Sequence, residues 1–595
     1  MLEFAVPALV PAPSDGNLAA LVVRKATEQA DHVLFSRRVG GGWHDVTAGQ
    51  FRDDVEEVAR GLVAAGVQPG DRIALMSRTR YEWTVVDFAI WTAGAITVPI
   101  YETSSAEQIA WILRDSGAVA CVVETSAHAA ALSSVRDQLA DLKDVWQIDA
   151  GGLVDLGVAG ADISDNELQA RRTAARPQDV ATLIYTSGTT GRPKGCELTH
   201  ANFMALADNA VARLGEVVSV DGASTLLFLP LAHVFARFIQ VLAITSGARL
   251  GHSADVKNLL DDLGDFQPTF LLSVPRVFEK IYNSAEQRAQ ADGKGRIFAL
   301  AAATSIAWSQ AEQDGGAGLW LTTRHRLFDA LVYSKLRARL GGKVEYAVSG
   351  GAPLGARLGH FFRGAGITVL EGYGLTETTA PSTVNRPDAL KVGTVGQPLP
   401  GVAIRVGVDG EVLIKGHNVL RGYWNNPTAT AEAVRDGWLH TGDLGELDDD
   451  GFLRITGRKK EIIVTAGGKN VAPSALEDRV RAHALVSQAL VVGDGKPFIA
   501  ALITLDAEML PTWAANHGKA GLTVEQAIDD PEVHAELQRA VDDANASVSK
   551  AESIRKFRIL AVDFTEETGH LTPSLKLKRN LVMKDFGDQV DELYR

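Results

Sequence analysis

The segment Tyr185–Gly195, which reads YTSGTTGRPKG, limits what this chain can be more than any other. It holds three glycines, four Ser or Thr hydroxyls and two cations, and it follows the strand-like run Val180–Ile184. Flexible backbone approaches phosphates closely, N–H groups and hydroxyls donate to their oxygens, and lysine offsets their charge. The order differs from a Walker loop, because Pro193 precedes Lys194 and Gly195 follows it. A polyphosphate-binding loop outside the ordinary P-loop NTPases is therefore predicted, with the candidate residues Thr186, Ser187, Gly188, Thr189, Thr190, Gly191 and Lys194.

Length and charge restrict the possibilities further. With 595 residues the chain exceeds a single core, so several subdomains are expected. A formal net charge of −14 opposes nonspecific binding to nucleic acid, and any anionic substrate must be met by local positive charge. The two cysteines, Cys121 and Cys196, form neither a disulfide framework nor a metal site, which fits a reducing cytosol. We expect no signal peptide and no membrane span.

Strand-like and amphipathic stretches alternate along the chain, as in an α/β fold with parallel sheets. Strands are predicted at 73–76, 94–101, 118–124 and 226–229, and a helix at 107–115. A mostly helical insertion is predicted over 284–340, where apolar residues from Leu327 to Leu340 recur at helical spacing with Arg and Lys between them. Two interpretations stay open for this basic helix: packing on its own domain, or peripheral contact with an anionic membrane or acyl substrate.

The charged run at Arg458–Lys460 follows the apolar strand 452–455 and marks a domain boundary. We predict an N-terminal domain over 1–457, a hinge at 458–460 and a C-terminal domain over 461–595, which is long enough for its own core.

Three further motifs carry groups suited to a nucleotide. Ser349–Leu354 contains the glycine pair Gly350 and Gly351 before Ala352, where backbone can lie flat against a planar ring such as adenine. The run Glu371–Thr378 surrounds Gly372 and Gly374 with carboxylates, hydroxyls and the Tyr373 ring. Mg²⁺ prefers one or two carboxylates together with phosphate oxygens. The third motif is the run from Asp436 to Lys460, in which Asp443 can accept hydrogen bonds from both ribose hydroxyls.

Together these motifs resemble the acyl-adenylate-forming superfamily. The run from Asp436 to Lys460 resembles the fatty acyl-CoA synthetase signature in particular. The resemblance implies a large multi-subdomain α/β N-terminal domain and a smaller, mobile α+β C-terminal lid. For the nucleotide, it implies that Tyr373 stacks on adenine, that Asp443 and Arg458 reach the ribose, and that Thr376 contacts the α-phosphate. Glu377 and Thr186 are implied to hold Mg²⁺, and Lys460 to be the hinge. His233 of the motif Leu229–Phe235 is implied to gate the acyl pocket.

The resemblance also assigns a lysine near the C-terminus. In the superfamily a Thr-Pro-x-Gly-Lys turn delivers a lysine to the substrate carboxylate and α-phosphate, and Lys576 stands at the matching distance from Thr572. Leu575 replaces the usual glycine, so Lys578 is kept as an alternative. After the hinge, many relatives have a lysine where this chain has Val464 and Thr465, and Lys469 is the candidate replacement. The loop at Gly467 and Gly468 is expected to face a CoA channel.

These features imply a long-chain fatty acid–CoA ligase that uses ATP, Mg²⁺ and coenzyme A and first forms an acyl-adenylate. A ligase that loads an acyl carrier protein shares nearly every motif, although no obvious insertion follows Lys460. A nonenzymatic acyl-binding protein would not need Glu377, Asp443 and Lys576, and a luciferase-like oxygenase is a remote third alternative. We expect a cytoplasmic protein, with peripheral contact at the inner face of the membrane left open, and either a monomer or a homodimer.

Overall fold

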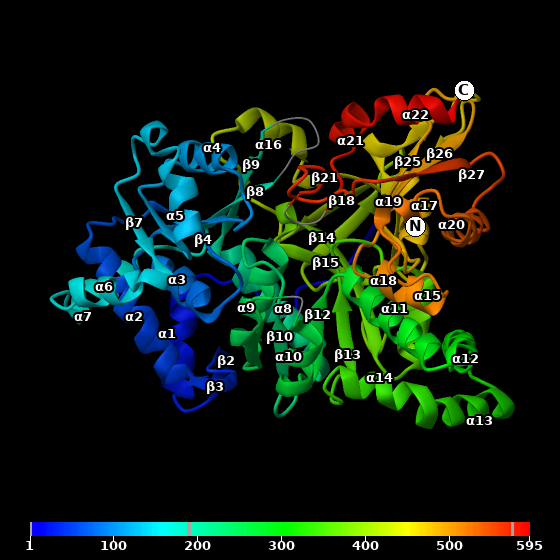
Figure 1. Ribbon diagram of the computed structural model, residues 1–595. Helices are drawn as coiled ribbons and strands as arrows, with labels where there is room; N and C mark the ends of the chain where they lie inside the picture. Colours follow the sequence, from blue (N-terminus) through cyan, green and yellow to red (C-terminus); the bar gives the residue numbers. More distant parts are fainter. Residues whose placement is uncertain (1–2, 187–191, 256–257, 573–575) are drawn as a thin grey trace.

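The computed structural model describes residues 3–186, 192–255, 258–572 and 576–595. A large α/β body holds most of the chain, and a smaller domain built from the C-terminal residues sits against one end of it (Figure 1). The predicted fold class, a large N-terminal domain with a smaller C-terminal one, is confirmed.

The first sheet of the body has seven strands, and it carries the candidate phosphate loop. Its order is β19 (Gly422–Tyr423), β9 (Lys194–Thr199), β8 (Val180–Thr186), β5 (Ile96–Ile100), β4 (Arg72–Met76), β6 (Ala120–Val123) and β7 (Asp144–Gln147). The strands from β8 to β7 are parallel, as the buried apolar runs predict, whereas β9 returns antiparallel to β8. Its accompanying helices are α1 (Leu18–Glu28), α2 (Ala48–Ala64), α3 (Tyr81–Thr92), α4 (Ala106–Ser116), α5 (Ser126–Ser133), α6 (Gly152–Ala159) and α7 (Asp165–Arg172).

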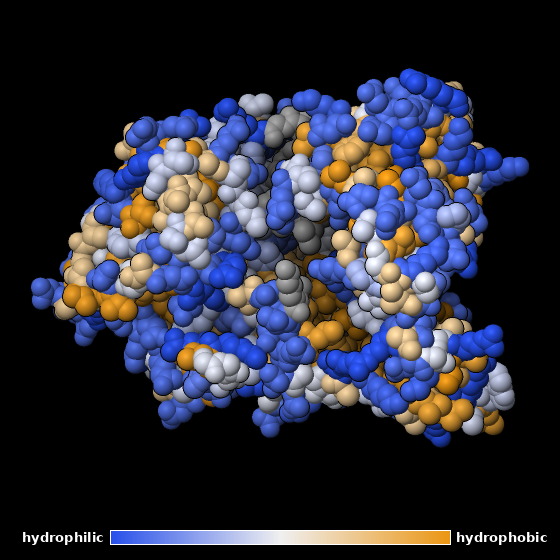
Figure 2. All heavy atoms as spheres, viewed as in Figure 1, coloured by the Kyte–Doolittle hydropathy of each residue, from blue (hydrophilic) through white to orange (hydrophobic). Residues whose placement is uncertain are grey.

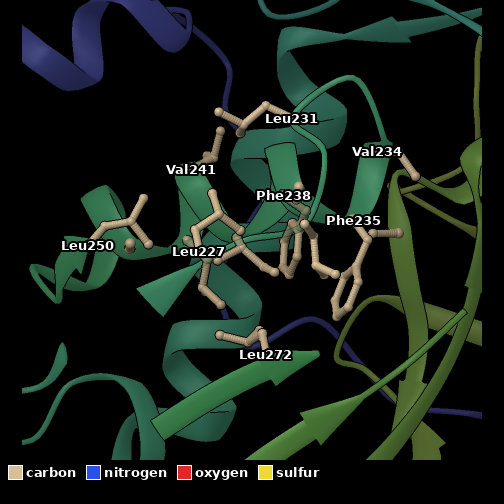
Figure 3. Packing of buried hydrophobic residues seen from close by; sticks show 14 of the residues in the cluster. Leu227, Leu231, Val234, Phe235, Phe238, Val241, Leu250 and Leu272 are labelled. Carbon is tan, nitrogen blue, oxygen red and sulfur yellow. The ribbon is translucent and has the colours of Figure 1, made fainter. Parts of the chain in front are cut away.

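Two further sheets continue the body. One has the order β10 (Ser224–Leu227), β11 (Arg249–His252), β2 (Val33–Val39) and β3 (Gly42–Thr47). The other has the order β12 (Phe270–Ser273), β13 (Tyr346–Ser349), β14 (Thr368–Leu375), β15 (Ala380–Val384) and β16 (Gln397–Pro398). Their helices are α8 (His200–Val218), α9 (Val234–Ser246), α10 (Leu259–Phe266) and α15 (Ala356–Gly364). Phe238 and Val241 of α9 belong to the same buried cluster as Leu227, Leu250 and Leu272, which come from three of these strands (Figure 3).

The predicted helical insertion is present but is not one continuous helix. It consists of α11 (Pro275–Ala291), α12 (Gly295–Gln313), α13 (Leu319–Phe328), a π-helical turn (Asp329–Tyr333) and α14 (Ser334–Arg339). The apolar residues from 327 to 340 divide between two faces, because Phe328, Leu336 and Leu340 are buried whereas Leu327 and Leu331 are exposed. The extra residue in the π-helical turn changes the helical phase, and simple periodicity does not anticipate that change.

A six-stranded sheet closes the body next to the C-terminal domain. Its order is β1 (Glu3–Ala5), β17 (Val402–Val406), β18 (Glu411–Gly416), β21 (Trp438–Leu447) and β20 (Val434–Arg435), with β22 (Leu453–Arg458) paired to β21. α16 (Pro427–Ala433) precedes β20. The register of β21 and β22 sets Asp443 opposite Arg458 at the end of this sheet.

The C-terminal domain begins after the 3₁₀ turn Lys459–Glu461 and has hydrophobic cores of its own. Its strands are β23 (Ile463–Val464), β24 (Asn470–Val471), β25 (Val486–Val492), β26 (Ile499–Leu505) and β27 (Ile554–Leu560). Its helices are α17 (Pro473–Arg481), α18 (Leu510–Asn516), α19 (Val524–Ala527), α20 (Pro531–Asn545), α21 (Arg579–Asp585) and α22 (Gly587–Leu593). β26 pairs antiparallel with β25 and parallel with β27, so the domain is α+β, as expected. The exact limits of the hinge, 458–460, stay a prediction.

Among the described residues, no helix is long and apolar enough to cross a membrane. Cys121 and Cys196 are both buried and free.

Candidate active site

A pocket of about 810 Å³ lies between the body and the C-terminal domain. The ends of β8, β9, β13 and β14 and the start of α9 line it from the body, and the turn at Thr572 and Lys576 lines it from the C-terminal domain. Most of the predicted site residues therefore meet in one cavity although they come from distant parts of the sequence.

The two ends of the phosphate loop face each other. Thr186 ends β8 directly opposite Lys194, the first residue of β9. Both residues line the pocket, and the Lys194 Nζ atom lies 5.2 Å from the centre of the Tyr423 ring. The loop residues Ser187, Gly188, Thr189, Thr190 and Gly191 lie outside the described residues. The described ends bring a hydroxyl and a cation to the same edge of the sheet, as a phosphate site requires.

Glu377 stands on a short 3₁₀ turn, Thr376–Thr378, at the end of β14. One of its carboxylate oxygens accepts a hydrogen bond of 2.8 Å from the Tyr423 hydroxyl. The chain then leaves the turn through Thr379 and Ala380, whose φ angles of 56° and 87° are unusual for residues with side chains. Asn418 donates to the Thr378 carbonyl and so holds the turn in place.

These groups suit Mg²⁺ bound through a nucleotide. Glu377 and Thr186 both line the pocket, and together they offer a carboxylate and a hydroxyl. Mg²⁺ is commonly held by one or two carboxylates and by substrate phosphates rather than by a cage of protein ligands. Accordingly, the described residues contain no group of three or more His, Cys, Asp or Glu that could hold a metal ion. The donor set therefore fits a metal that arrives with ATP.

At the other end of the pocket, the lining residues Tyr373 and Arg458 both contact Asp443, which does not itself line the pocket. The Tyr373 hydroxyl donates to one Asp443 oxygen at 2.7 Å, and Arg458 contacts the other at 2.8 Å. Burial, followed by the Asp443 charge, raises the pKa of Tyr373 well above its usual value. Asp443 is 3% exposed, so it lies behind the tyrosine and arginine rather than open to solvent. Side chains from two sheets, Tyr373 on β14 and the pair Asp443–Arg458 on β21 and β22, thus preorganise this end.

Glycines permit close backbone approach at this end. A Cβ added to Gly374 would lie 1.7 Å from the Ala380 carbonyl oxygen, and Gly351 has a φ of +84°. Gly350, Gly351 and Gly372 line the pocket together with Thr376, whereas Ala352 is exposed beyond them. These contacts require glycine at 374 and favour it at 351.

Glu371 has a different place from the one its motif suggests. It is 8% exposed, does not line the pocket, and accepts a 2.9 Å hydrogen bond from the Leu354 backbone N–H. Burial raises the pKa of Glu371 to about 7, with a further contribution from Asp478 of the C-terminal domain. Glu371 therefore supports the glycine-rich loop from behind.

The C-terminal domain contributes Lys576. Two hydrogen bonds join Lys576 to Thr572: the Thr572 N–H donates to the Lys576 carbonyl at 2.8 Å, and the Lys576 N–H donates to the Thr572 hydroxyl at 3.0 Å. The side chain reaches into the space between the domains, where it keeps a solvent-exposed surface. The surrounding protein, and then the Arg458 guanidinium, lower the pKa of Lys576. Lys578 instead precedes α21 and does not line the pocket.

His233 lies on the pocket wall next to this lysine. It caps the N-terminus of α9, where its Nδ1 accepts from the Phe235 N–H at 3.2 Å. Burial, and then the Lys576 charge, lower the pKa of His233 to about 4. The imidazole is therefore neutral near pH 7, and its cap bond fixes the ring at the start of α9.

The glycine-rich loop of the C-terminal domain lies outside the pocket. Gly467 and Gly468 are exposed in the turn between β23 and β24. Lys469, the proposed replacement for the missing lysine, pairs with Glu552 at 3.3 Å and does not line the pocket. Lys460, by contrast, does line it. The arrangement presents Lys576, and not the loop at Gly467 and Gly468, to the pocket.

Two contributions to the site were missed from the sequence. Tyr423, the partner of Glu377, lies on the two-residue strand β19, which pairs with β9 of the phosphate-loop hairpin. The start of α11 meets the C-terminal domain, because Arg276 pairs with Asp506 at 2.9 Å and Lys280 pairs with Glu508 at 2.8 Å. The sequence signal for this contact was the spacing of Arg276 and Lys280, two cations four residues apart that share one face of a helix.

Comparison with known proteins agrees with this geometry. A model of the AMP-binding enzyme family matches residues 22–424, and a model of the C-terminal domain of AMP-binding enzymes matches residues 460–595. The chain belongs to the AMP-binding enzyme family. A relative in Mycobacterium bovis, the long-chain-fatty-acid–CoA ligase FadD15, is 53% identical over 598 residues and covers 100% of both chains. The long-chain-fatty-acid–CoA ligase 1 of Cavia porcellus is 32% identical and covers 94% of this chain and 84% of its own.

Two solved structures share the fold of this chain. The adenylation domain of a carboxylate reductase from Mycobacterium chelonae matches with a TM-score of 0.74 at 22% identity, covering 98% of this chain and 92% of that one. An anthranilate CoA ligase solved with anthranoyl-AMP matches with a TM-score of 0.72 at 20% identity, covering 96% and 98%.

Proposed function

We propose that this protein is a long-chain fatty acid–CoA ligase that converts ATP, a fatty acid and coenzyme A into acyl-CoA, AMP and pyrophosphate. The observation that carries the proposal is the meeting of Lys576 with Thr186, Lys194, Glu377 and His233 in one pocket. Full-length identity of 53% to a long-chain-fatty-acid–CoA ligase supports the same substrates.

The first half-reaction joins two anions. A carboxylate oxygen of the fatty acid attacks the α-phosphorus of ATP, the bond to the β-phosphate oxygen breaks, and pyrophosphate leaves with that electron pair. Lys194 and Lys576 bring positive charge to the pocket, and Thr376 and the described ends of the phosphate loop donate hydrogen bonds. Mg²⁺, held by Glu377 and Thr186, would supply further neutralisation of the phosphates. The mechanism needs no protein nucleophile.

Groups at the nucleoside end would hold the rest of ATP. Tyr373 offers a ring for adenine, with the glycine backbone at 350 and 351 beside it. Asp443 and Arg458 would receive the ribose by exchanging part of their present contacts for its hydroxyls. His233, neutral and fixed at the start of α9, would border the acyl group and gate its pocket.

The second half-reaction needs a different arrangement. The CoA thiolate attacks the acyl carbon, AMP leaves, and a thioester forms. In our proposal the C-terminal domain turns about Lys460, which withdraws Lys576 and brings Gly467 and Gly468 toward the CoA channel. The exposed position of those glycines supports this, because they have no part in the present pocket.

Substitution of Lys460 by proline tests the turning step. Proline fixes φ and removes the backbone N–H, so the hinge should lose the freedom it needs. We expect Lys460→Pro to form acyl-AMP at a rate near that of the wild type but to convert supplied acyl-AMP and CoA slowly. An unchanged thioester rate would refute the hinge role.

The acceptor is tested with purified protein, Mg²⁺-ATP and fatty acids of graded length, with and without CoA. Mass spectrometry should detect acyl-CoA only when CoA is present, and its yield should rank the chain lengths. Acyl-AMP that accumulates in the presence of CoA would favour the carrier-protein ligase instead. The use of ATP and CoA and the free, buried cysteines fit a cytoplasmic enzyme.

A further inference from the structure

The insertion carries an apolar surface that the body leaves uncovered. On α13 and the π-helical turn after it, Leu319 is 91% exposed, Trp320 71%, Leu327 58% and Leu331 46%. Trp320, Leu327 and Leu331 are seven and four residues apart, a spacing that places them on one helical face. We call these four residues the α13 apolar face. The helix projects at the lower right of Figure 1, and Figure 2 shows hydrophobic surface at that corner with hydrophilic surface around it.

The opposite side of the same segment is firmly packed, so the exposure does not reflect a loosely attached helix. His325 stacks on Trp308 with ring centres 4.3 Å apart, and its Nε2 contacts the Gly364 carbonyl at 2.5 Å. Phe328 and Tyr333 are buried, and the Tyr333 hydroxyl donates to the Ala301 carbonyl at 2.6 Å. These contacts hold the α13 apolar face outward in one orientation.

The segment that carries this face is rich in basic residues, although the protein is acidic overall. Six Lys or Arg and one Asp lie between residues 319 and 343, although the whole chain has a net charge of −14. The acid, Asp329, is paired with Arg337 at 2.7 Å. In the described parts of the chain, Arg326, Lys335 and Arg339 have no ion-pair partner. The Arg324 guanidinium lies 5.3 Å from the centre of the Trp320 ring, which joins a cation to the apolar face.

An exposed apolar pair on α6 provides a comparison within the molecule. On α6, Val154 and Val158 are 66% and 73% exposed, four residues apart, and Asp155 lies beside them. That pair is apolar without a basic border. Leucine and tryptophan on one face with arginine and lysine around it is the arrangement that settles at the boundary between lipid headgroups and acyl chains.

We propose that the α13 apolar face, together with the basic residues of the same segment, Arg324, Arg326, Lys335 and Arg339, forms a docking surface for an anionic lipid bilayer. Charge complementarity selects this occupant, because anionic headgroups attract each basic residue near the surface while the apolar side chains enter the headgroup region. A second copy of the chain docked face to face would set the same cations against each other. The docking surface does not depend on the reaction proposed above.

Sedimentation of the full-length protein with vesicles tests the proposal. We expect binding to vesicles of phosphatidylcholine mixed with phosphatidylglycerol, little binding to phosphatidylcholine alone, and loss of binding at high salt. Trp320→Ser/Leu327→Ser and Arg326→Ser/Arg339→Ser should each weaken partition by about tenfold or more. Val154→Ser/Val158→Ser is the matched control and should bind like the wild type. Thermal melting of each variant checks that these exposed substitutions leave the fold intact.

A second readout locates the contact. Thr323 is exposed within α13, and both native cysteines are buried, so a Thr323→Cys variant accepts an environment-sensitive fluorophore at one position. Its emission should shift to the blue on anionic vesicles, whereas the same fluorophore at Val154→Cys should not shift. Absence of vesicle binding by the wild type, equal binding by all variants, or a change of oligomeric state in place of vesicle binding would each overturn the proposal.

Discussion

The two sides of the nucleotide pocket are held in place by different kinds of contact. On the body side, Arg237 of α9 and Asp87 of α3 form an ion pair in which both side chains are 0% exposed. On the side of the C-terminal domain, the pair Lys280–Glu508 has side chains that are 45% and 67% exposed. Removing one partner of a buried ion pair strongly lowers the free energy of unfolding, whereas exposed ion pairs contribute little to it. The difference supports our proposal that the nucleotide site belongs to the rigid body and that a separable domain brings Lys576 to it.

The largest effect should come from breaking the buried pair. Arg237 also donates to Thr182, and Gln240 donates to Asp87 at 3.1 Å, so removal of the carboxylate leaves a buried cation with few partners. Asp87→Ala should lower the free energy of unfolding by about 3–5 kcal/mol, measured by urea denaturation. The double variant Asp87→Leu/Arg237→Met should recover much of that loss. A single variant as stable as the wild type would contradict the assigned role of the pair.

A second prediction concerns Glu371 and pH. Its pKa is about 7 in the folded protein and near 4.5 in the unfolded chain, so the folded state retains a proton as pH rises between these values. The contribution of this proton to the free energy of unfolding is fully present below about pH 4.5. It is lost as pH rises to about 7, and the total loss is roughly 3 kcal/mol. Thermal melts should show this decline in the wild type and a flatter profile in Glu371→Gln. Identical pH profiles for the wild type and Glu371→Gln would mean that a group other than Glu371 titrates.

The third prediction separates the two half-reactions. Lys576→Ala should slow acyl-AMP formation by roughly 100-fold or more, because it removes positive charge from the meeting of two anions. Formation of acyl-CoA from supplied acyl-AMP should be spared. Lys578→Ala is the control and should leave both rates near those of the wild type, since Lys578 does not line the pocket. Equal loss in both halves would remove Lys576 from its proposed role.

The smallest effect should come from the domain contact. Lys280→Glu sets two acids against each other at an exposed site, and we expect acyl-AMP formation to slow by about two- to fivefold. The charge swap Lys280→Glu/Glu508→Lys should restore the rate, which would show coupling between these two residues rather than general damage. A loss of the same size in the swapped variant would contradict the contact.

Local motifs predicted much of the site, because each lies at the end of a strand or in a tight turn that its own residues determine. The run Val180–Ile184 forms β8, and Thr186, Tyr373, Glu377 and Lys576 meet as expected. Glu371 was placed in the nucleotide site, but its side chain points to the Leu354 backbone instead. A strand alternates its faces, and the motif alone did not indicate which face meets the pocket.

Contacts between distant segments were not predictable in the same way. The bond from Tyr423 to Glu377 joins residues 46 positions apart, and the pair Arg276–Asp506 joins the two domains. In neither pair does the local sequence around one residue indicate which residue is its partner. The division of the apolar residues from 327 to 340 between two faces depends on the π-helical turn, which regular periodicity does not represent.

The central claim is that the C-terminal domain must be close for the first half-reaction and must move for the second. Cysteines placed at Arg276 and Asp506, joined by a short bis-maleimide, would lock the present arrangement, and the buried native cysteines should not interfere. We predict that the locked enzyme forms acyl-AMP and pyrophosphate from ATP and fatty acid but makes almost no acyl-CoA, while the unlinked double variant makes both. Acyl-CoA formed at an undiminished rate by the locked enzyme would contradict the account.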